Sequence, residues 1–284
     1  MEVWTSTFLI LVLTITKTKY LPTPPPLDLL TQIGDITKRA GQEIMKVYET
    51  DFQVETKADQ SPVTEADKAA EDLIIRSITM GLTDKYPIVS EEAFADGHAP
   101  DVTGTPFWLV DPLDGTKEFV KKNGEFTVNI ALIDAGKPVL GVIHAPALGQ
   151  TYWGAHIGVF AQSSDDNEHT IACRQAPAEG LTAMVSRSHR SDEMEAFLAN
   201  YNITDEITSG SSIKLCRIAE GQADIYPRIG RTMEWDTAAG HAIIHFAGGN
   251  VIDMDGNELQ YGKPGFENPH FIVQGPGVEP NTAT

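Results

Sequence analysis

Cysteine is scarce in this sequence, and its scarcity excludes several classes of protein. The chain has 284 residues but only 2 cysteines, Cys173 and Cys216, which lie far apart. Because no two cysteines are separated by two residues, the sequence contains neither a zinc ribbon nor a thioredoxin-like redox motif. Two isolated cysteines are typical of reduced, partly buried thiols in a cytoplasmic enzyme.

Positive charge is also scarce. Lysine and arginine total 21 against 40 aspartates and glutamates, which gives a formal net charge of -19. A surface with this balance repels a nucleic-acid backbone, so we expect no nucleic-acid polymer among the partners. A small anionic substrate would need a local reversal of charge, which bound divalent cations provide.

Long apolar runs are absent, which argues against a transmembrane segment. The mainly apolar stretch Phe8 to Ile15 is far shorter than the ~20 residues that span a bilayer. Glu2 precedes it where a secretory signal would carry basic residues, and a proline triplet follows. We expect residues 1–26 to be an extension that is either unstructured or wrongly assigned to the start of the protein. Peripheral association with the inner face of the membrane is the alternative.

The rest of the chain predicts two halves. Apolar residues recur at steps of three and four from Leu27, which indicates a helix, and a block of strands follows after residue 107. A hydrophilic break at Ser163 to His169 precedes alternating strands and helices. We therefore expect an α+β half at 27–165 and an α/β half at 166–284.

The clearest chemical signal is the segment Asp-Pro-Leu-Asp-Gly-Thr at Asp111 to Thr116. A buried strand ends in Asp111, and a proline turn can bring Asp114 back toward it. Two such carboxylates repel one another without cations, so the pair favours a hard ion such as Mg²⁺. The Leu113 carbonyl is a further oxygen ligand, and the amides of Gly115 and Thr116 can face a phosphate. The alternative is an ordinary turn, which these residue types also favour.

Two more acidic sites accompany this segment. Glu91 follows a short predicted strand, and Asp236 stands at the start of a predicted helix. Each has an ordinary explanation when taken alone, as a solvated loop residue or a helix N-cap. Three acidic sites at the ends of strands or helices nevertheless suggest one shared cluster.

Four segments together resemble the inositol monophosphatase superfamily of lithium-sensitive metal phosphatases. They are Glu91, Asp111–Thr116, Trp235–Gly240 and the upstream Ser61–Asp67. A further set is similar to its 3′(2′),5′-bisphosphate nucleotidase branch: Asp114–Phe119, Asn123–Leu132, Ser186–His189 and Gly210–Lys214. The resemblance covers nearly the whole chain after the extension. It implies an α+β fold, a layered α-β-α-β-α sandwich of the inositol monophosphatase and fructose-1,6-bisphosphatase type, with the active site between the halves.

The resemblance also implies a set of metal ligands. Two or three Mg²⁺ ions are expected. They are held by Glu91, Asp111, the Leu113 carbonyl, Asp114 and Asp236.

The same resemblance implies catalysis by a metal-activated water. Thr116 and Asp67 form the activating pair, and Glu91 helps to orient the water. Asp67 also occupies a capping-box position, which leaves a purely structural role open for it.

The implied reaction is removal of the 3′-phosphate of adenosine 3′,5′-bisphosphate, which leaves AMP. Lys214 and Arg228 are expected to hold the second phosphate, and Ser211 and His189 to place the nucleoside. Substrate contacts from Gly115, Thr116 and Asp236 complete the site. Enzymes that resemble this one clear adenosine 3′,5′-bisphosphate left by sulfur assimilation or by phosphopantetheine transfer. An inositol or sugar phosphatase, and a non-catalytic nucleotide-sensing protein, remain the alternatives. The sequence does not indicate an oligomeric state.

Overall fold

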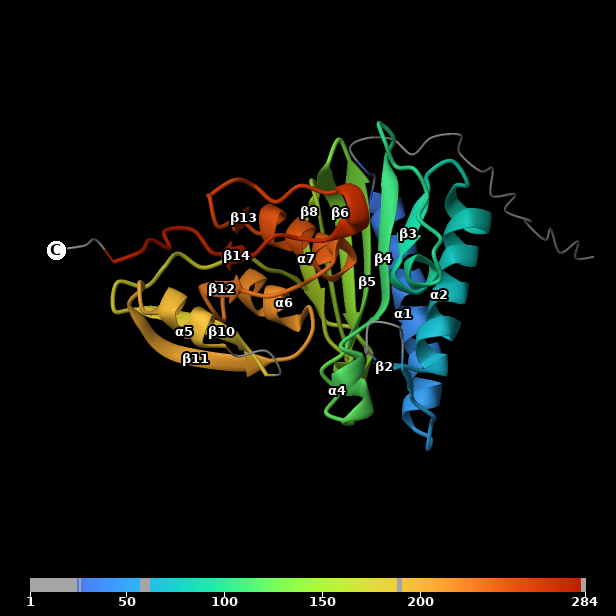
Figure 1. Cartoon of the computed structure of the whole chain (residues 1–284), viewed down its shortest axis with the longest axis horizontal. Helices are drawn as coiled ribbons and strands as arrows, with labels where there is room; N and C mark the ends of the chain where they lie inside the picture. The colour runs from blue at the N-terminus through green and yellow to red at the C-terminus, as the bar shows by residue number, and fades with distance from the viewer. Residues whose placement is uncertain (1–24, 26, 57–61, 188–190, 282–284) are drawn as a thin grey trace, which may run out of the picture.

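The computed structural model describes residues 25, 27–56, 62–187 and 191–281, arranged as in Figure 1. Nearly all of the predicted extension 1–26 lies outside the described residues, and so does His189. Within the described ranges, no helix has both the length and the apolar character needed to cross a bilayer. Both cysteines are free thiols; Cys216 is buried and Cys173 is half-buried.

Two long helices cover one face of the larger sheet. They are α1 (Leu27–Tyr48) and α2 (Glu65–Ser77), and α2 continues into a π-helical turn at Ile78–Leu82. The predicted capping box of α2 is confirmed: Thr64 Oγ1 accepts from the Ala66 amide, and the Asp67 carboxylate accepts from the Thr64 amide at 2.8 Å. These bonds satisfy amides that would otherwise lack partners at the helix start.

The larger sheet has seven strands in the order β3-β4-β5-β6-β7-β8-β9. Its strands are β3 (Ile88–Ser90), β4 (Phe107–Asp114), β5 (Thr127–Asp134), β6 (Lys137–Ala145), β7 (Gln150–Ala155), β8 (Gly158–Gln162) and β9 (Glu168–Thr170). β3 and β4 are parallel, and all other neighbours are antiparallel. A small hairpin, β1 (Glu55–Thr56) and β2 (Pro62–Val63), stands apart from it. β9 belongs to this sheet, so the larger sheet extends past residue 166. The division of the chain into two halves at residues 165 and 166 stays a prediction.

The smaller sheet has five strands in the order β11-β10-β12-β14-β13. Its strands are β10 (Leu181–Ser186), β11 (Ile203–Ser209), β12 (Ile225–Arg228), β13 (Asn250–Asp253) and β14 (Phe271–Gln274). β10 runs parallel to β11 and β12, whereas β14 is antiparallel to β12 and β13. The helices of this half are α5 (Asp192–Leu198), α6 (Ile213–Ala219) and α7 (Glu234–Phe246). The short helices are α3 (Glu91–Ala95) and α4 (Thr116–Val120), with 3-10 turns at Pro146–Leu148 and Pro264–Phe266.

Five layers follow from the packing of these elements, as Figure 1 shows from right to left. The layers are α1 with α2, the larger sheet, α6 with α7, the smaller sheet, and α5. The predicted α-β-α-β-α order is therefore confirmed. α7 packs closely on β6 and β7. The packing is so close that a side chain at Gly141 or Gly154 would collide with the backbone of α7. This close approach brings the first turn of α7 beside the larger sheet.

Candidate active site

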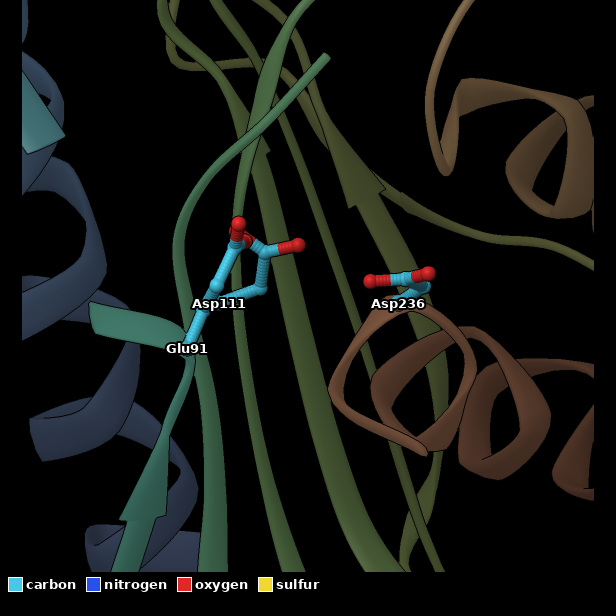
Figure 2. A group of neighbouring side chains, drawn as sticks. All are labelled: Glu91, Asp111 and Asp236. Atoms are coloured by element: carbon cyan, nitrogen blue, oxygen red, sulfur yellow. The ribbon is translucent and has the colours of Figure 1, made fainter. Parts of the chain in front are cut away.

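Three carboxylates from separate elements converge at one point. Glu91 is the first residue of α3, Asp111 lies within β4, and Asp236 lies in the first turn of α7. Each offers an oxygen atom, and these atoms all lie within 4.8 Å of one another. In Figure 2, Glu91 and Asp111 lie together at the larger sheet while Asp236 faces them from the helix. The shared cluster predicted from the three acidic sites is thus present.

The cluster has the electrostatics of a cation site. Burial raises the pKa of Asp236 to about 8, and the charges of Asp114 and Glu91 act in the same direction. Carboxylates held together in this way are destabilised by their mutual repulsion, which a bound cation relieves. A donor set made only of carboxylate oxygens suits hard divalent ions such as Mg²⁺. The residues therefore fit the predicted kind of metal.

Asp114 lies beside this cluster and has an orienting partner of its own. Its Oδ2 accepts two hydrogen bonds from Ser212, from the amide and from Oγ, both at 2.6 Å. The Ser212 hydroxyl also lies 2.9 Å from the carbonyl oxygen of Asp236 and accepts from Asn129 Nδ2 at 2.8 Å. Burial raises the pKa of Asp114, whereas the Ser212 hydrogen bonds and the Lys214 charge act to lower it.

Ser212 and Asn129 are site residues that the sequence analysis missed. Both lie inside segments that carried the family resemblance, but nothing in their local pattern separates them from ordinary strand or loop residues. Ser212 follows Ser211, and only the folded chain shows which of the two hydroxyls faces Asp114.

The predicted pair Thr116 and Asp67 is brought together. Thr116 Oγ1 lies 3.4 Å from Asp67 Oδ1 and 3.3 Å from the Leu113 carbonyl oxygen. The other carboxylate oxygen of Asp67 accepts from the Thr64 amide and hydroxyl, both at 2.8 Å. The capping contact thus uses Oδ2, while Oδ1 is the oxygen nearest the Thr116 hydroxyl. One carboxylate serves both the helix cap and the site.

A cavity of about 210 Å³ adjoins the acidic cluster. The predicted residues that line it are Asp114, Gly115, Thr116, Ser211, Lys214, Arg228 and Asp236. Lining residues that the sequence analysis did not predict include Lys117, Glu118, Tyr226 and Thr232. His189 lies outside the described residues, so its predicted place here stays untested.

Cationic and polar groups line the side of the cavity formed by the second half of the chain. Lys214 is 5% exposed, and its Nζ donates to the Ser211 carbonyl at 2.6 Å and lies 5.3 Å from the centroid of the Tyr226 ring. Burial lowers the pKa of Lys214 to about 8, against the opposing effect of Asp114. Among the residues that the structure describes, Ser211 Oγ and Arg228 Nε are buried and have no hydrogen-bond partner. Buried polar atoms without partners beside a cavity fit a polar ligand.

Gly115 allows the two halves to meet at this cavity. Its φ is 89°, a conformation that side chains disfavour, and it forms the N-cap of α4. A Cβ atom there would lie 3.1 Å from Ser211 Cβ and 3.2 Å from the Glu125 carbonyl oxygen. Glycine is therefore required both by the backbone conformation and by the close approach of the Ser211 loop.

A carboxylate cluster suited to hard cations, beside a cavity with a buried lysine and an arginine, is the arrangement of a metal-dependent phosphatase. Residues 28–276 match the model of the inositol monophosphatase family, and the chain belongs to this family.

Among its relatives, the chain is 44% identical to the 3′(2′),5′-bisphosphate nucleotidase CysQ of Salmonella typhimurium over 250 residues, which are 86% of this chain and 99% of that protein. It is 43% identical over 248 residues to CysQ of Escherichia coli strain K12, with 86% of this chain and 99% of the relative covered. Among solved structures, CysQ from Bacteroides thetaiotaomicron is 37% identical with a TM-score of 0.74, covering 89% of this chain and 98% of that one. A Thermotoga maritima IMPase is 26% identical with a TM-score of 0.71, covering 88% of this chain and 93% of its own.

Proposed function

We propose that this protein is a 3′(2′),5′-bisphosphate nucleotidase that removes the 3′-phosphate of adenosine 3′,5′-bisphosphate and leaves AMP and inorganic phosphate. The observation that carries the proposal is one cavity lined both by carboxylates of the cation site and by cationic side chains. Asp114 and Asp236, beside the acidic cluster, line it, and so do Lys214 and Arg228. A substrate with two phosphates matches this lining, because one phosphate can bind through cations and the other directly to the lysine and arginine. The chain is 44% identical to a bisphosphate nucleotidase over nearly the whole length of that relative, which supports the same substrate class.

The metal ligands follow from the acidic cluster. Two or three Mg²⁺ ions would be held by Glu91, Asp111, Asp114, Asp236 and the carbonyl of Leu113. When bound, these ions supply charge neutralisation to the transferred phosphate and lower the pKa of water.

The protein's own groups orient the attacking water. When the Thr116 hydroxyl donates toward Asp67 Oδ1, its lone pairs are available to accept a hydrogen bond from water. Asp67 can then receive a proton through Thr116, and its contacts with Thr64 hold it in place for this role. Glu91 offers a second acceptor to the same water.

The cationic side chains of the cavity would select the substrate. The buried ammonium of Lys214 and the guanidinium of Arg228 would hold the 5′-phosphate, which is not cleaved. Ser211, Gly115 and Thr116 line the same cavity.

A metal-titrated phosphate-release assay on the full chain tests the proposal. With adenosine 3′,5′-bisphosphate, we expect release that requires Mg²⁺ and a nucleotide product that is AMP. Binding of the nucleotide without release of phosphate at any Mg²⁺ concentration would favour a non-catalytic sensor. Faster turnover of inositol 1-phosphate than of the bisphosphate would favour an inositol phosphatase.

A further inference from the structure

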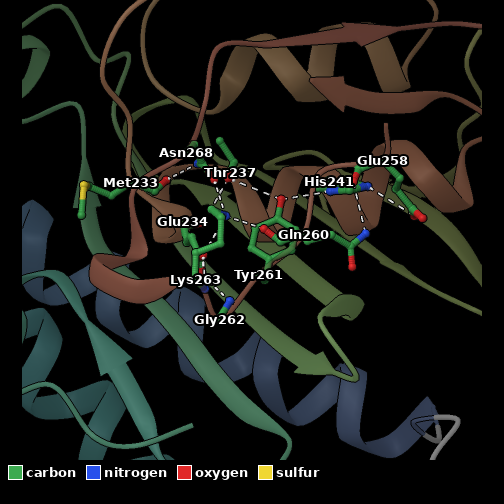
Figure 3. Close-up of polar contacts among 10 residues, drawn as sticks. All are labelled: Met233, Glu234, Thr237, His241, Glu258, Gln260, Tyr261, Gly262, Lys263 and Asn268. Carbon is green, nitrogen blue, oxygen red and sulfur yellow. Dashed lines mark hydrogen bonds and ion pairs between the residues drawn. The ribbon is translucent and has the colours of Figure 1, made fainter. Parts of the chain in front are cut away.

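The first turn of α7, which carries Asp236, is anchored by a buried polar network from the loop between β13 and β14 (Figure 3). Glu234 is fully buried, and its carboxylate accepts from the Gly262 amide at 2.7 Å and the Lys263 amide at 2.9 Å. The ammonium of Lys263 lies 2.7 Å from the same carboxylate. The loop is thereby fixed against the start of the helix, although the two segments are far apart in the sequence.

Asn268, on the same loop, holds the residue that precedes the helix from both sides. Its backbone amide donates to the Thr232 carbonyl at 2.9 Å, and its Nδ2 donates to the Met233 carbonyl at 2.8 Å and to Thr237 Oγ1 at 3.0 Å. The Met233 amide donates to Asp236 Oδ2 at 2.9 Å. The peptide unit joining Thr232 to Met233 therefore accepts from Asn268 at one end and donates to Asp236 at the other.

A hydrogen bond from Lys263 fixes the orientation of the Asn268 side chain. Lys263 Nζ donates to Asn268 Oδ1 at 3.2 Å, which fixes the oxygen on the lysine side and turns the NH₂ group toward α7. Asn268 is 5% exposed, so these bonds have little competition from water. The bond to the Thr232 carbonyl comes from the backbone of Asn268, so the side chain itself contributes the bonds to the Met233 carbonyl and to Thr237 Oγ1.

We propose that Asn268 is a positioning residue for the carboxylate of Asp236, and that through Asp236 it sets the affinity of the acidic cluster for divalent cations. The inference rests on the proposed function, because it takes Asp236 as a cation ligand. Partners that orient a ligand in this way affect both metal affinity and activity. Without the side-chain NH₂ group of Asn268, the Met233 carbonyl and the Thr237 hydroxyl each lose a hydrogen bond. Met233, whose amide binds Asp236 Oδ2, is then less firmly placed, and so is the Asp236 carboxylate.

Mn²⁺ is a suitable probe, because its binding to the full chain is measured directly by electron paramagnetic resonance, without substrate. We expect Asn268→Ala to weaken Mn²⁺ binding by about tenfold or more. We expect the same direction from Asn268→Asp, which keeps the acceptor for Lys263 but removes the NH₂ donor. The added negative charge alone would strengthen cation binding, so the two effects differ in sign. Excess Mg²⁺ should restore most of kcat in both variants.

Thr37→Val is the matched control. Thr37 is fully buried in α1, on the opposite face of the larger sheet, and its hydroxyl donates to the Ile33 carbonyl at 2.6 Å. The control thus loses a buried hydrogen bond, as Asn268→Ala does, and its melting temperature should fall while its affinity for Mn²⁺ stays at the wild-type value.

Asp236→Asn distinguishes an error in the role of Asn268 from an error in the metal site itself. If this variant weakens Mn²⁺ binding while Asn268→Ala and Asn268→Asp bind like wild type, the role of Asn268 is refuted and the metal site stands. If Asn268→Ala does not fold, Asn268→Asp and the sign of its effect decide. If wild-type protein binds no Mn²⁺, both the inference and the metal site are refuted.

Discussion

Replacing Lys214 with methionine removes one charge from the cavity while keeping an unbranched side chain that is only one atom shorter. Lys214 is almost fully buried, and its ammonium donates to the Ser211 carbonyl at 2.6 Å and lies over the Tyr226 ring. Methionine can keep the contact with the ring but offers no donor to a phosphate. The change therefore tests whether this ammonium recognises the phosphate that is not cleaved.

The expected magnitude follows from the kind of bond that is lost. A hydrogen bond between a charged donor and a phosphate contributes ~1.5–3 kcal/mol, which corresponds to about 10–100-fold in kcat/KM. The loss should fall on adenosine 3′,5′-bisphosphate. Adenosine 3′-monophosphate lacks the second anion, so its kcat/KM should change by less than about threefold, which corresponds to about 0.6 kcal/mol.

Initial rates of phosphate release with both substrates check this prediction. Lys121→Met is the matched control, because Lys121 is an exposed lysine at the end of α4 and does not line the cavity. It should leave both kcat/KM values unchanged. Equal losses on the two substrates in Lys214→Met would show that Lys214 does not recognise the second phosphate, and would favour a general phosphomonoesterase.

Three other predictions concern the metal site. Asp114→Asn should lower the rate on the order of 10³-fold or more without unfolding the protein, because a charged ligand is lost; near-normal turnover in a phosphate-release assay would contradict the assignment. Li⁺ at roughly tens of millimolar should inhibit, since a small hard monovalent ion can occupy an oxygen site without supplying the charge of Mg²⁺, and full activity there would contradict this. Because the pKa of Asp236 is raised to about 8 in the folded protein, the free energy of unfolding of metal-free protein should decrease as pH rises from about 4 to about 8. Urea denaturation in the presence of a chelator measures it, and a contribution that increased with pH would contradict the raised pKa.

Local sequence signals were sufficient to predict the acidic cluster and the position of Asp67 beside it. Asp67 follows Thr64 at capping-box spacing, and Asp236 lies in the first turn of a helix, so periodicity and capping place both residues without knowledge of the fold. Glu91 directly follows the short strand β3, as expected. The layered order of the elements came from the family resemblance, since periodicity alone does not determine which face of a sheet a helix covers.

The path of the chain through the aspartate segment was predicted less well. A turn was expected after Asp111, but β4 continues to Asp114 with a register shift between Asp111 and Asp114. Pro112 has no amide to donate, and the irregular pairing at this point accommodates it within the strand. The chain therefore does not reverse here. It forms a bulge within β4, and the bulge still brings both aspartates to the site.

Partners that act through tertiary contacts had no local signal. Ser212 reaches Asp114 from a loop 98 residues further along the chain, and Asn129 reaches Ser212 across 83 residues. The contact from Asn268 to Met233 spans 35 residues. A serine or asparagine in such a position looks like any turn or strand residue until the chain is folded.

A comparison of kcat/KM for adenosine 3′,5′-bisphosphate and inositol 1-phosphate, both at saturating Mg²⁺, tests the central claim most directly, with the nucleotide product identified by chromatography. The account predicts a clear preference for the bisphosphate, AMP as the product, and no phosphate release once a chelator removes the cation. Release of the 5′-phosphate, an equal or higher kcat/KM for inositol 1-phosphate, or undiminished turnover in the chelator would contradict it.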